Sequence, residues 1–382
     1  MLALGVLAQA AGTLLVSTPA YLIPLLHIDR GVPLPQAGLL ASAPTFGMVL
    51  TLVGWGALAD RYGERWVIAA GLALAAVFAL VAVPVSGTVG LGLLLLLGGA
   101  ASASTNAASG RVVVGWFPRS RRGLAMGIRQ MSQPLGVAVA AVAVPPLAHR
   151  FGPGGPLLLA GVVLVVLAVL CAFGIANPPR VAARAVTDAP TNPYRASGFL
   201  WRIHLVSALL VVPQFTLSIF GLVWLITQLH WSATAAGVVI GLSQFIGAIG
   251  RIVIGSWSDR VGSRVRVLHW VSASGVVVML ALGAVGAVHW SAAAAVVLII
   301  ATTVSVADNG LSFTSVAEAA GPAWSGKALG MQNTGQFLAA SVVGPGIGAL
   351  ITAVGYPVAF ALVAIAPLVS FPLIPHRDRH WS

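Results

Sequence analysis

Apolar segments of about twenty residues, with few or no charged residues, follow one another along almost the whole chain of 382 residues. A helix of that length and composition can cross the hydrocarbon core of a bilayer. Charged residues make up only 7% of the chain, whereas soluble globular proteins contain roughly 25%. Such a chain cannot cover its surface with polar groups in water. The sequence therefore predicts an all-α protein that crosses a lipid bilayer many times.

Twelve segments meet this requirement. We predict membrane-spanning helices at Leu2–Leu26, Gln36–Leu58, Trp66–Val85, Val89–Val114, Gly123–Ala148, Gly154–Ala176, Trp201–Thr227, Ala233–Trp257, Val265–Val288, Ser291–Val316, Lys327–Ala353 and Pro357–Ile374. The stretch Asn177–Gly198 is rich in proline and arginine and has no long apolar run. We therefore expect a six-helix half at residues 1–176, a linker at 177–200 and a second six-helix half at 201–382. No basic segment precedes the first span, so we expect a retained helix and not a cleaved signal peptide.

The basic residues give the expected orientation. If the linker is cytoplasmic, fifteen of the twenty lysines and arginines fall on the cytoplasmic side, and only Arg30 and Arg150 fall on the other. Cytoplasmic loops of membrane proteins carry this excess. We therefore expect a multi-pass protein of the cell (inner) membrane with both termini in the cytoplasm. The net charge of +12 does not indicate nucleic-acid binding, because the basic residues lie in short connectors between apolar runs.

The two halves carry one pattern at a constant spacing. Two glycines, an aspartate and two arginines follow the second span and recur 199 residues later, after the eighth span. They are Gly56, Asp60, Arg61, Gly63 and Arg65 in the first half and Gly255, Asp259, Arg260, Gly262 and Arg264 in the second. At an offset of 203 residues, Asn106 matches Asn309 and Gln133 matches Gln336. We predict two parallel six-helix repeats related by an axis along the membrane normal.

The repeated loop has a physical interpretation as a gating latch. Glycine at a helix end allows a sharp chain reversal and a close approach of helices. The aspartates Asp60 and Asp259 can accept hydrogen bonds at the N-terminus of a neighbouring helix, where the helix dipole favours negative charge. Such a latch can break and reform as the two halves rock. The alternative is a basic turn that carries an incidental aspartate.

The segment Gly54–Arg65 resembles the signature loop of the major facilitator superfamily, in which a Gly-x-x-x-Asp-Arg-x-Gly-x-Arg pattern joins helices two and three. The second copy of the loop, the twelve spans and the central linker extend the resemblance over the whole chain. It implies the major facilitator fold. It also implies alternating access around a central cavity that helices one, four, seven and ten line.

Two segments resemble one branch of this superfamily. Trp116–Gly127 is similar to the helix four–five region of oxalate/formate, monocarboxylate and cyanate-type porters. Gly250-Arg251 resembles the helix-eight arginine that those anion porters use on a carboxylate. Drug–proton antiporters differ, because Leu91–Gly99 lacks their usual arginine and Gln133 stands where their helix five has glycine. The resemblance therefore implies a porter for small anions.

Arginines within the spans are candidate substrate-binding residues, because an ionisable group at membrane depth costs at least ~2.5–3.5 kcal/mol. Arg129 and Arg251 lie in helices five and eight, which the resemblance places opposite each other. Two planar guanidinium groups can hold a carboxylate or phosphate through paired hydrogen bonds. The alternative is that each arginine reaches back to the membrane surface or fastens helix ends.

Asp308 is a candidate for proton coupling, because it is a lone carboxylate deep within a span. It could equally be a permanent ion-pair partner of an arginine, or lie in a solvated position. Asn106, Asn309 and Gln130 are further candidates for substrate binding. Hydrogen bonding between helices is the commoner role of such intramembrane amides.

These observations favour a secondary active transporter that moves a small organic anion together with protons. The alternative within the same superfamily is a proton-driven exporter of drugs or metabolites. A receptor on this scaffold should carry an added soluble domain or long tail, and we expect none here. An enzyme is disfavoured because no nucleophile–base set or phosphate-binding loop occurs. We expect a monomer in the lipid bilayer, with no cofactor or metal site and no nucleic-acid partner. Cys171 is the single cysteine.

Overall fold

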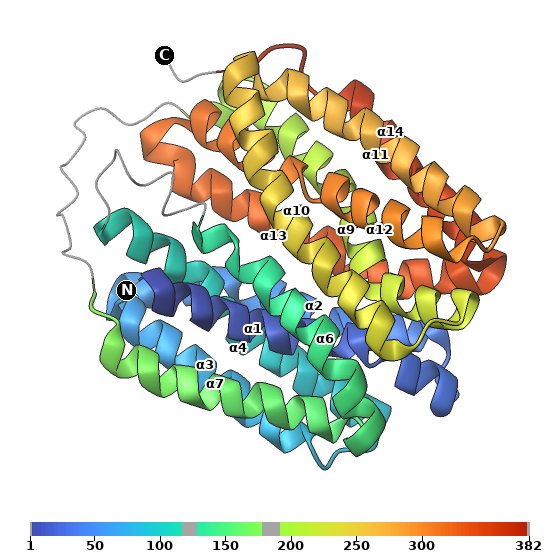
Figure 1. Ribbon diagram of the computed structural model, residues 1–382. Coiled ribbons are helices and arrows are strands. Elements are labelled where there is room, and N and C mark those ends of the chain that lie inside the picture. The colour runs from blue at the N-terminus through green and yellow to red at the C-terminus, as the bar shows by residue number, and fades with distance from the viewer. Residues whose placement is uncertain (1, 117–127, 178–191, 380–382) are drawn as a thin grey trace. The chain divides into compact units, whose positions relative to one another are not determined.

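The computed structural model describes residues 2–116, 128–177 and 192–379, and every regular element in these ranges is helical (Figure 1). The first part forms α1 (Leu2–Tyr21), η1 (Leu25–Asp29), α2 (Leu34–Tyr62), α3 (Glu64–Ala82), α4 (Thr88–Trp116), α6 (Ser132–Phe151) and α7 (Gly154–Gly174). The second forms α8 (Pro193–Ala196), α9 (Phe199–Leu229), α10 (Ala233–Val261), α11 (Arg264–Ala287), α12 (Ser291–Ser305), α13 (Asp308–Val363) and α14 (Ile365–Leu373).

Eleven helical spans among the described residues are long and apolar enough to cross a membrane. The last of them, Trp324–Leu373, contains the final two predicted spans except for the terminal Ile374. Gly355 separates these two, because its φ of 78° interrupts the helical backbone inside α13. Gly321, with a φ of 71°, likewise ends the preceding span, Ser291–Gly321. The prediction of an all-α protein with about a dozen membrane-spanning helices is confirmed.

The chain forms two compact units. The first contains Met1–Arg180, Ile219–Phe245 and Ser341–Ala349, and the second contains Val181–Ser218, Ile246–Ala340 and Leu350–Ser382. Most of the predicted linker, residues 178–191, lies outside the described residues. Residues 117–127, which include most of the segment that resembles anion porters, also lie outside the described residues.

Small residues allow close helix packing in the first unit. α4 packs against α2 and α3, and α7 packs beside α3 (Figure 1). At the crossing of α2 and α4, a side chain on Gly47 would collide with the carbonyl of Leu96, and one on Gly99 would collide with that of Pro44. Glycine is therefore required where these two backbones touch.

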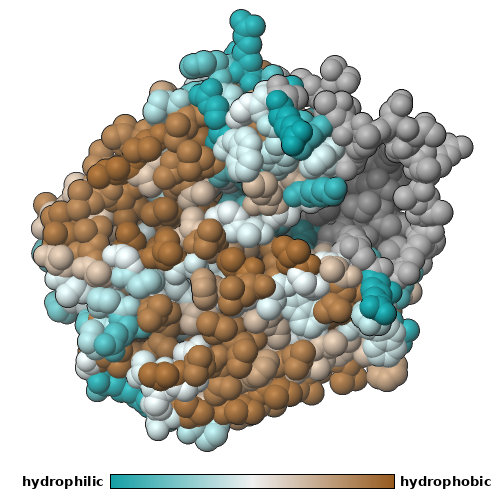
Figure 2. Space-filling view, turned by 180° about the vertical axis from the view of Figure 1, so that it is seen from behind, coloured by the Kyte–Doolittle hydropathy of each residue, from teal (hydrophilic) through white to brown (hydrophobic). Residues whose placement is uncertain are grey.

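Large apolar side chains also cover much of the surface (Figure 2). Val53, Phe173 and Val277 are 75%, 83% and 65% exposed on helices of the two units. Soluble proteins rarely expose contiguous apolar patches of this kind, whereas a lipid-facing surface requires them.

Candidate substrate and coupling site

A hydrogen-bonded amide pair joins α1 to α4 in the first unit. Gln9 is 4% exposed, and its Nε2 donates to Asn106 Oδ1 at 2.9 Å. Ser109, one turn further along α4, donates from its hydroxyl to Gln9 Oε1 at 3.2 Å. The pair places amide groups inside two predominantly apolar helices.

Arg129 extends this cluster. Its Nε donates to Ser109 Oγ at 2.9 Å, and its Nη2 donates to the backbone carbonyl of Asn106 at 3.3 Å. The side chain is half-buried, in the helical turn that precedes α6. The guanidinium group is thus held against α4. Gln130 is also half-buried in this turn.

The second unit contains the corresponding amide pair. Asn309 Nδ2 donates to Gln214 Oε1 at 3.0 Å and thereby joins α13 to α9. Gln336 Nε2 donates to Asn309 Oδ1 at 3.0 Å and to Ser207 Oγ at 2.6 Å. The sequence repeat that matches Asn106 to Asn309 therefore corresponds to the same amide contact within each unit.

Gln9 and Gln214 were not among the residues predicted from sequence. A signal for them exists, because they are polar residues inside apolar spans and lie 205 residues apart, close to the offset of the asparagines. Spacing alone cannot show that a glutamine in one helix contacts an asparagine in another, about a hundred residues away.

Asp308 lies where the regular helix is interrupted. Val306 and Ala307 separate α12 from α13, so the carboxylate stands in the first turn of α13, where the helix dipole stabilises negative charge. Asp308 is 1% exposed, and neither of its oxygens accepts a hydrogen bond from another described side chain. A cavity of about 10 Å³ lies beside it, lined also by Ser305 and Pro213 and otherwise mostly by apolar residues. This volume is enough for about one water molecule.

Arg251 of α10 provides the opposite charge. It lies close enough for Coulomb attraction to Asp308, and its buried Nε makes no hydrogen bond. Gly250 explains this proximity, because a Cβ there would lie 2.7 Å from Thr303 Cγ2 on α12. A Cβ on Gly247 would likewise lie 3.2 Å from Val306 Cγ2. The two glycines allow α10 to approach α12 at the level of the arginine and the aspartate.

The clamp of Arg129 and Arg251 expected from the sequence stays a prediction. Arg129 belongs to the first unit and Arg251 to the second, and each is positioned only within its own unit. Within the units, Arg129 donates a hydrogen bond to the Asn106 carbonyl, and Arg251 lies near Asp308 without a hydrogen bond to it.

The first copy of the repeated loop reverses at Gly63, whose φ is 88°. The backbone N–H of Arg65 donates to Asn177 Oδ1 at 2.9 Å, and Arg65 Nε donates to the carbonyl of Ala172 on α7 at 2.5 Å. The loop is thus tied to the segment that follows α7. The Asp60 side chain lies outside the described part of the chain.

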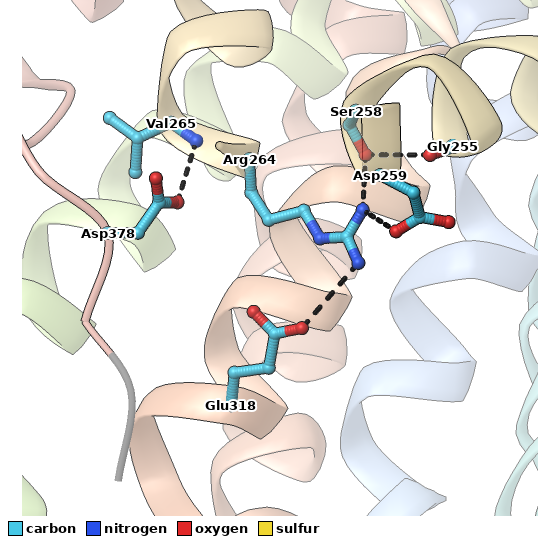
Figure 3. A network of polar contacts seen from close by, with 7 residues as sticks. All are labelled: Gly255, Ser258, Asp259, Arg264, Val265, Glu318 and Asp378. Atoms are coloured by element: carbon cyan, nitrogen blue, oxygen red, sulfur yellow. Dashed lines mark hydrogen bonds and ion pairs between the residues drawn. The ribbon is translucent and has the colours of Figure 1, made fainter. Parts of the chain in front are cut away.

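The second copy forms an ionic network within the second unit (Figure 3). Arg264 pairs with Asp259 at 2.5 Å and with Glu318 of α13 at 3.6 Å, and it also donates to Ser258 Oγ. The chain reverses at Gly262, whose φ is 67°. This network ties the α10–α11 loop to α13.

Asp378 and Asn177 are loop partners that the sequence prediction missed. Asp378 accepts from the Val265 N–H at 3.0 Å, at the start of α11 (Figure 3). It also accepts from the Ser263 hydroxyl. Asn177 accepts from Arg65 at the start of α3. The two side chains follow the last helix of their respective repeats, 201 residues apart, and this offset was the available signal.

No cluster of metal-ligating side chains occurs among the residues that the structure describes. The polar groups instead form paired amides, the buried Asp308 carboxylate and arginines, on helices that are long enough to span a membrane. This composition can bind a polar or anionic solute and hold a proton.

Comparison with known proteins gives the class. The sequence profile of the Major Facilitator Superfamily matches residues 5–343, so the chain belongs to this superfamily, whose members are transporters and not enzymes. An uncharacterized MFS-type transporter of Mycobacterium tuberculosis strain ATCC 25618 / H37Rv is 45% identical over 369 residues. The alignment covers 96% of this chain and 82% of the relative, and a counterpart in strain CDC 1551 / Oshkosh matches equally.

Solved structures agree on the fold. A bacterial homologue of the human lysosomal transporter Spinster, in an inward-facing and occupied conformation, superposes with a TM-score of 0.81 at 14% identity. The match covers 98% of this chain and 95% of the homologue. A mutant of the nucleoside transporter NupG gives a TM-score of 0.75 at 16% identity and covers 97% of this chain and 98% of its own. At these identities the likeness concerns the fold alone.

Proposed function

We propose that this transporter moves a small organic anion together with a proton by alternating access. The observation that carries the proposal is the Asp308 carboxylate, which is buried, lacks a side-chain hydrogen-bond donor and lies near the Arg251 guanidinium. Each charge alone would be costly at membrane depth, and each offsets the other. Their lack of a direct hydrogen bond leaves both free to engage another partner.

An anion supplies that partner. When the carboxylate of a substrate binds Arg251, it takes the place of Asp308 as the counter-charge of the arginine. Asp308 then has no positive charge to balance it, and its buried carboxyl group favours the neutral, protonated form. Binding of the anion and uptake of the proton are thereby linked through one arginine. No second acid is needed for this step.

The amide pairs contact the uncharged part of the substrate. Asn106 is held by Gln9, and Asn309 is held by Gln214 and Gln336, so both asparagine amides are fixed in direction. Arg129 supplies a second positive charge from the first repeat. In this proposal, Arg129 and Arg251 hold the anion in the two-sided clamp that the sequence predicts, with Gln130 nearby.

The substrate class is testable by uptake. Proteoliposomes should accumulate at least one of formate, oxalate, lactate and cyanate when the outer pH is lower than the inner pH. Transport of a lipophilic cation such as tetraphenylphosphonium, with no anion transported, would instead assign the chain to the drug-exporter class.

The proposed orientation predicts how introduced cysteines react. In a Cys171→Ser background, Arg266→Cys should react with an impermeant maleimide only in inverted vesicles, because Arg266 lies on the basic side. Thr88→Cys lies at the opposite end of its repeat and should react in intact cells. Both side chains are exposed, which makes them accessible to the reagent. Reaction of Arg266→Cys with the maleimide in intact cells would contradict the proposed orientation.

The proposed gating role separates the two loop aspartates. Asp60→Asn should reduce transport by about tenfold with near-normal membrane insertion, if its latch contributes about 1.5 kcal/mol, the lower end of the range for a hydrogen bond to a charged group. The Asp259 side chain is 65% exposed, so Asp259→Asn should cost at most about fivefold, because exposed ion pairs contribute little. Uptake rates normalised to surface expression provide the measurement. Full activity of Asp60→Asn would contradict the latch.

A further inference from the structure

A groove of about 680 Å³ opens in the first unit, at the end of its helices opposite the Gly63 loop. The turns 83–86 and 152–155 form its mouth, and the start of α7 and the end of α6 form its walls. A pocket of this size can hold a drug-sized molecule or a large part of a lipid. None of the predicted substrate-binding or gating residues lines it.

The groove is amphipathic. Its walls carry Phe151, Leu158 and Val162, which are 66%, 49% and 51% exposed. From Gly154 to Val162 the α7 wall rises about 12 Å, at 1.5 Å per residue. Several carbons of an acyl chain can therefore lie along it. The loops that flank the mouth place it at the surface of the membrane.

Arg30 provides the single charge of the lining. Its side chain is exposed, and its Nη2 lies 3.7 Å from the position that a Cβ on Gly152 would take. A larger residue at Gly152, whose φ is 64°, would strain this turn. The uncapped N-terminus of α7 adds partial positive charge at the same turn.

We infer that this groove binds one anionic membrane phospholipid, with its phosphate on Arg30 and an acyl chain along α6 and α7. Charge complementarity selects the anionic headgroup, and the exposed apolar wall selects a chain-bearing ligand over a free anion. Arg30 is also one of only two basic residues that the sequence places on its side of the membrane. Its charge is therefore not part of a general basic surface that would bind any anionic lipid.

Native mass spectrometry of the full chain, delipidated and titrated with phosphatidylglycerol, tests this inference. The wild type should bind one phosphatidylglycerol more tightly than phosphatidylcholine. Arg30→Gln should weaken that binding about fivefold, the worth of one cation near an anionic headgroup. Arg30→Lys should retain most of it. Arg150→Gln is the matched control, because Arg150 is exposed at the same end and does not line the groove.

Val162→Trp tests the apolar wall without removing charge, and it should weaken the same binding event. Equal affinity for phosphatidylcholine, unchanged binding by Arg30→Gln, or an equal loss in Arg150→Gln would overturn the inference. Competition by glycerol phosphate as strong as that of the lipid would also overturn it, because the acyl chain would then contribute nothing. Thermal unfolding of each variant without lipid shows whether the fold is intact.

Discussion

Replacing Asp308 with asparagine is expected to abolish proton-driven accumulation of the substrate. Asparagine has nearly the same shape but can neither carry the negative charge nor exchange the proton. The variant should bind substrate and exchange it across the membrane, while its accumulation under an imposed pH gradient falls to that of empty liposomes. The measurement compares uptake driven by a pH gradient with counterflow at equal pH.

Glu318→Gln is the matched control for this experiment. It removes a carboxylate from the same helix, but one that is partly exposed and paired with Arg264 in the loop network. It should retain most of the accumulation. An Asp308→Asn protein that accumulates substrate as the wild type does would remove Asp308 from the coupling mechanism.

Arg251→Lys is expected to weaken anion binding by about tenfold to a hundredfold, the range of one or two charged hydrogen bonds. Lysine keeps the charge but loses the planar fork that holds both carboxylate oxygens. Arg266→Lys is the control, since that arginine is exposed on the surface. Unchanged anion affinity in Arg251→Lys would argue for a structural role.

A double variant separates binding from charge balance. Arg251→Gln alone leaves Asp308 buried without a balancing charge and should lower the yield of folded protein. Adding Asp308→Asn removes the unbalanced charge and should restore the yield without restoring transport. Equal yields for the single and double variants would show that the two charges do not compensate each other.

Local sequence features predicted the spans well, because length and hydropathy decide whether a helix can lie in lipid. The repeat likewise predicted that Asn106 and Asn309 occupy equivalent places. The break before Asp308 was not predictable, because the apolar pattern runs through Val306 and Ala307 without a proline or glycine. The contacts of α12 with α10 at Gly247 and Gly250 are tertiary, and a single sequence does not display them.

The contacts of the two repeated loops likewise could be predicted from the sequence only where the partners are near each other in the chain. Asp259 and Arg264 are near in sequence, and their ion pair is a local feature of the repeated pattern. Asp378, in contrast, reaches the start of α11 from the end of the chain. Glycine at 63 and 262 was expected from the turn it permits, and both residues have the positive φ that favours glycine.

Substrate-induced proton movement tests the central claim most directly. Proteoliposomes that enclose a pH-sensitive dye and start at equal pH should acidify internally when a transported anion is added outside. The acidification should disappear in Asp308→Asn. It should require a higher anion concentration in Arg251→Lys. Transport of the anion at an undiminished rate with no change of internal pH would contradict proton coupling through Asp308.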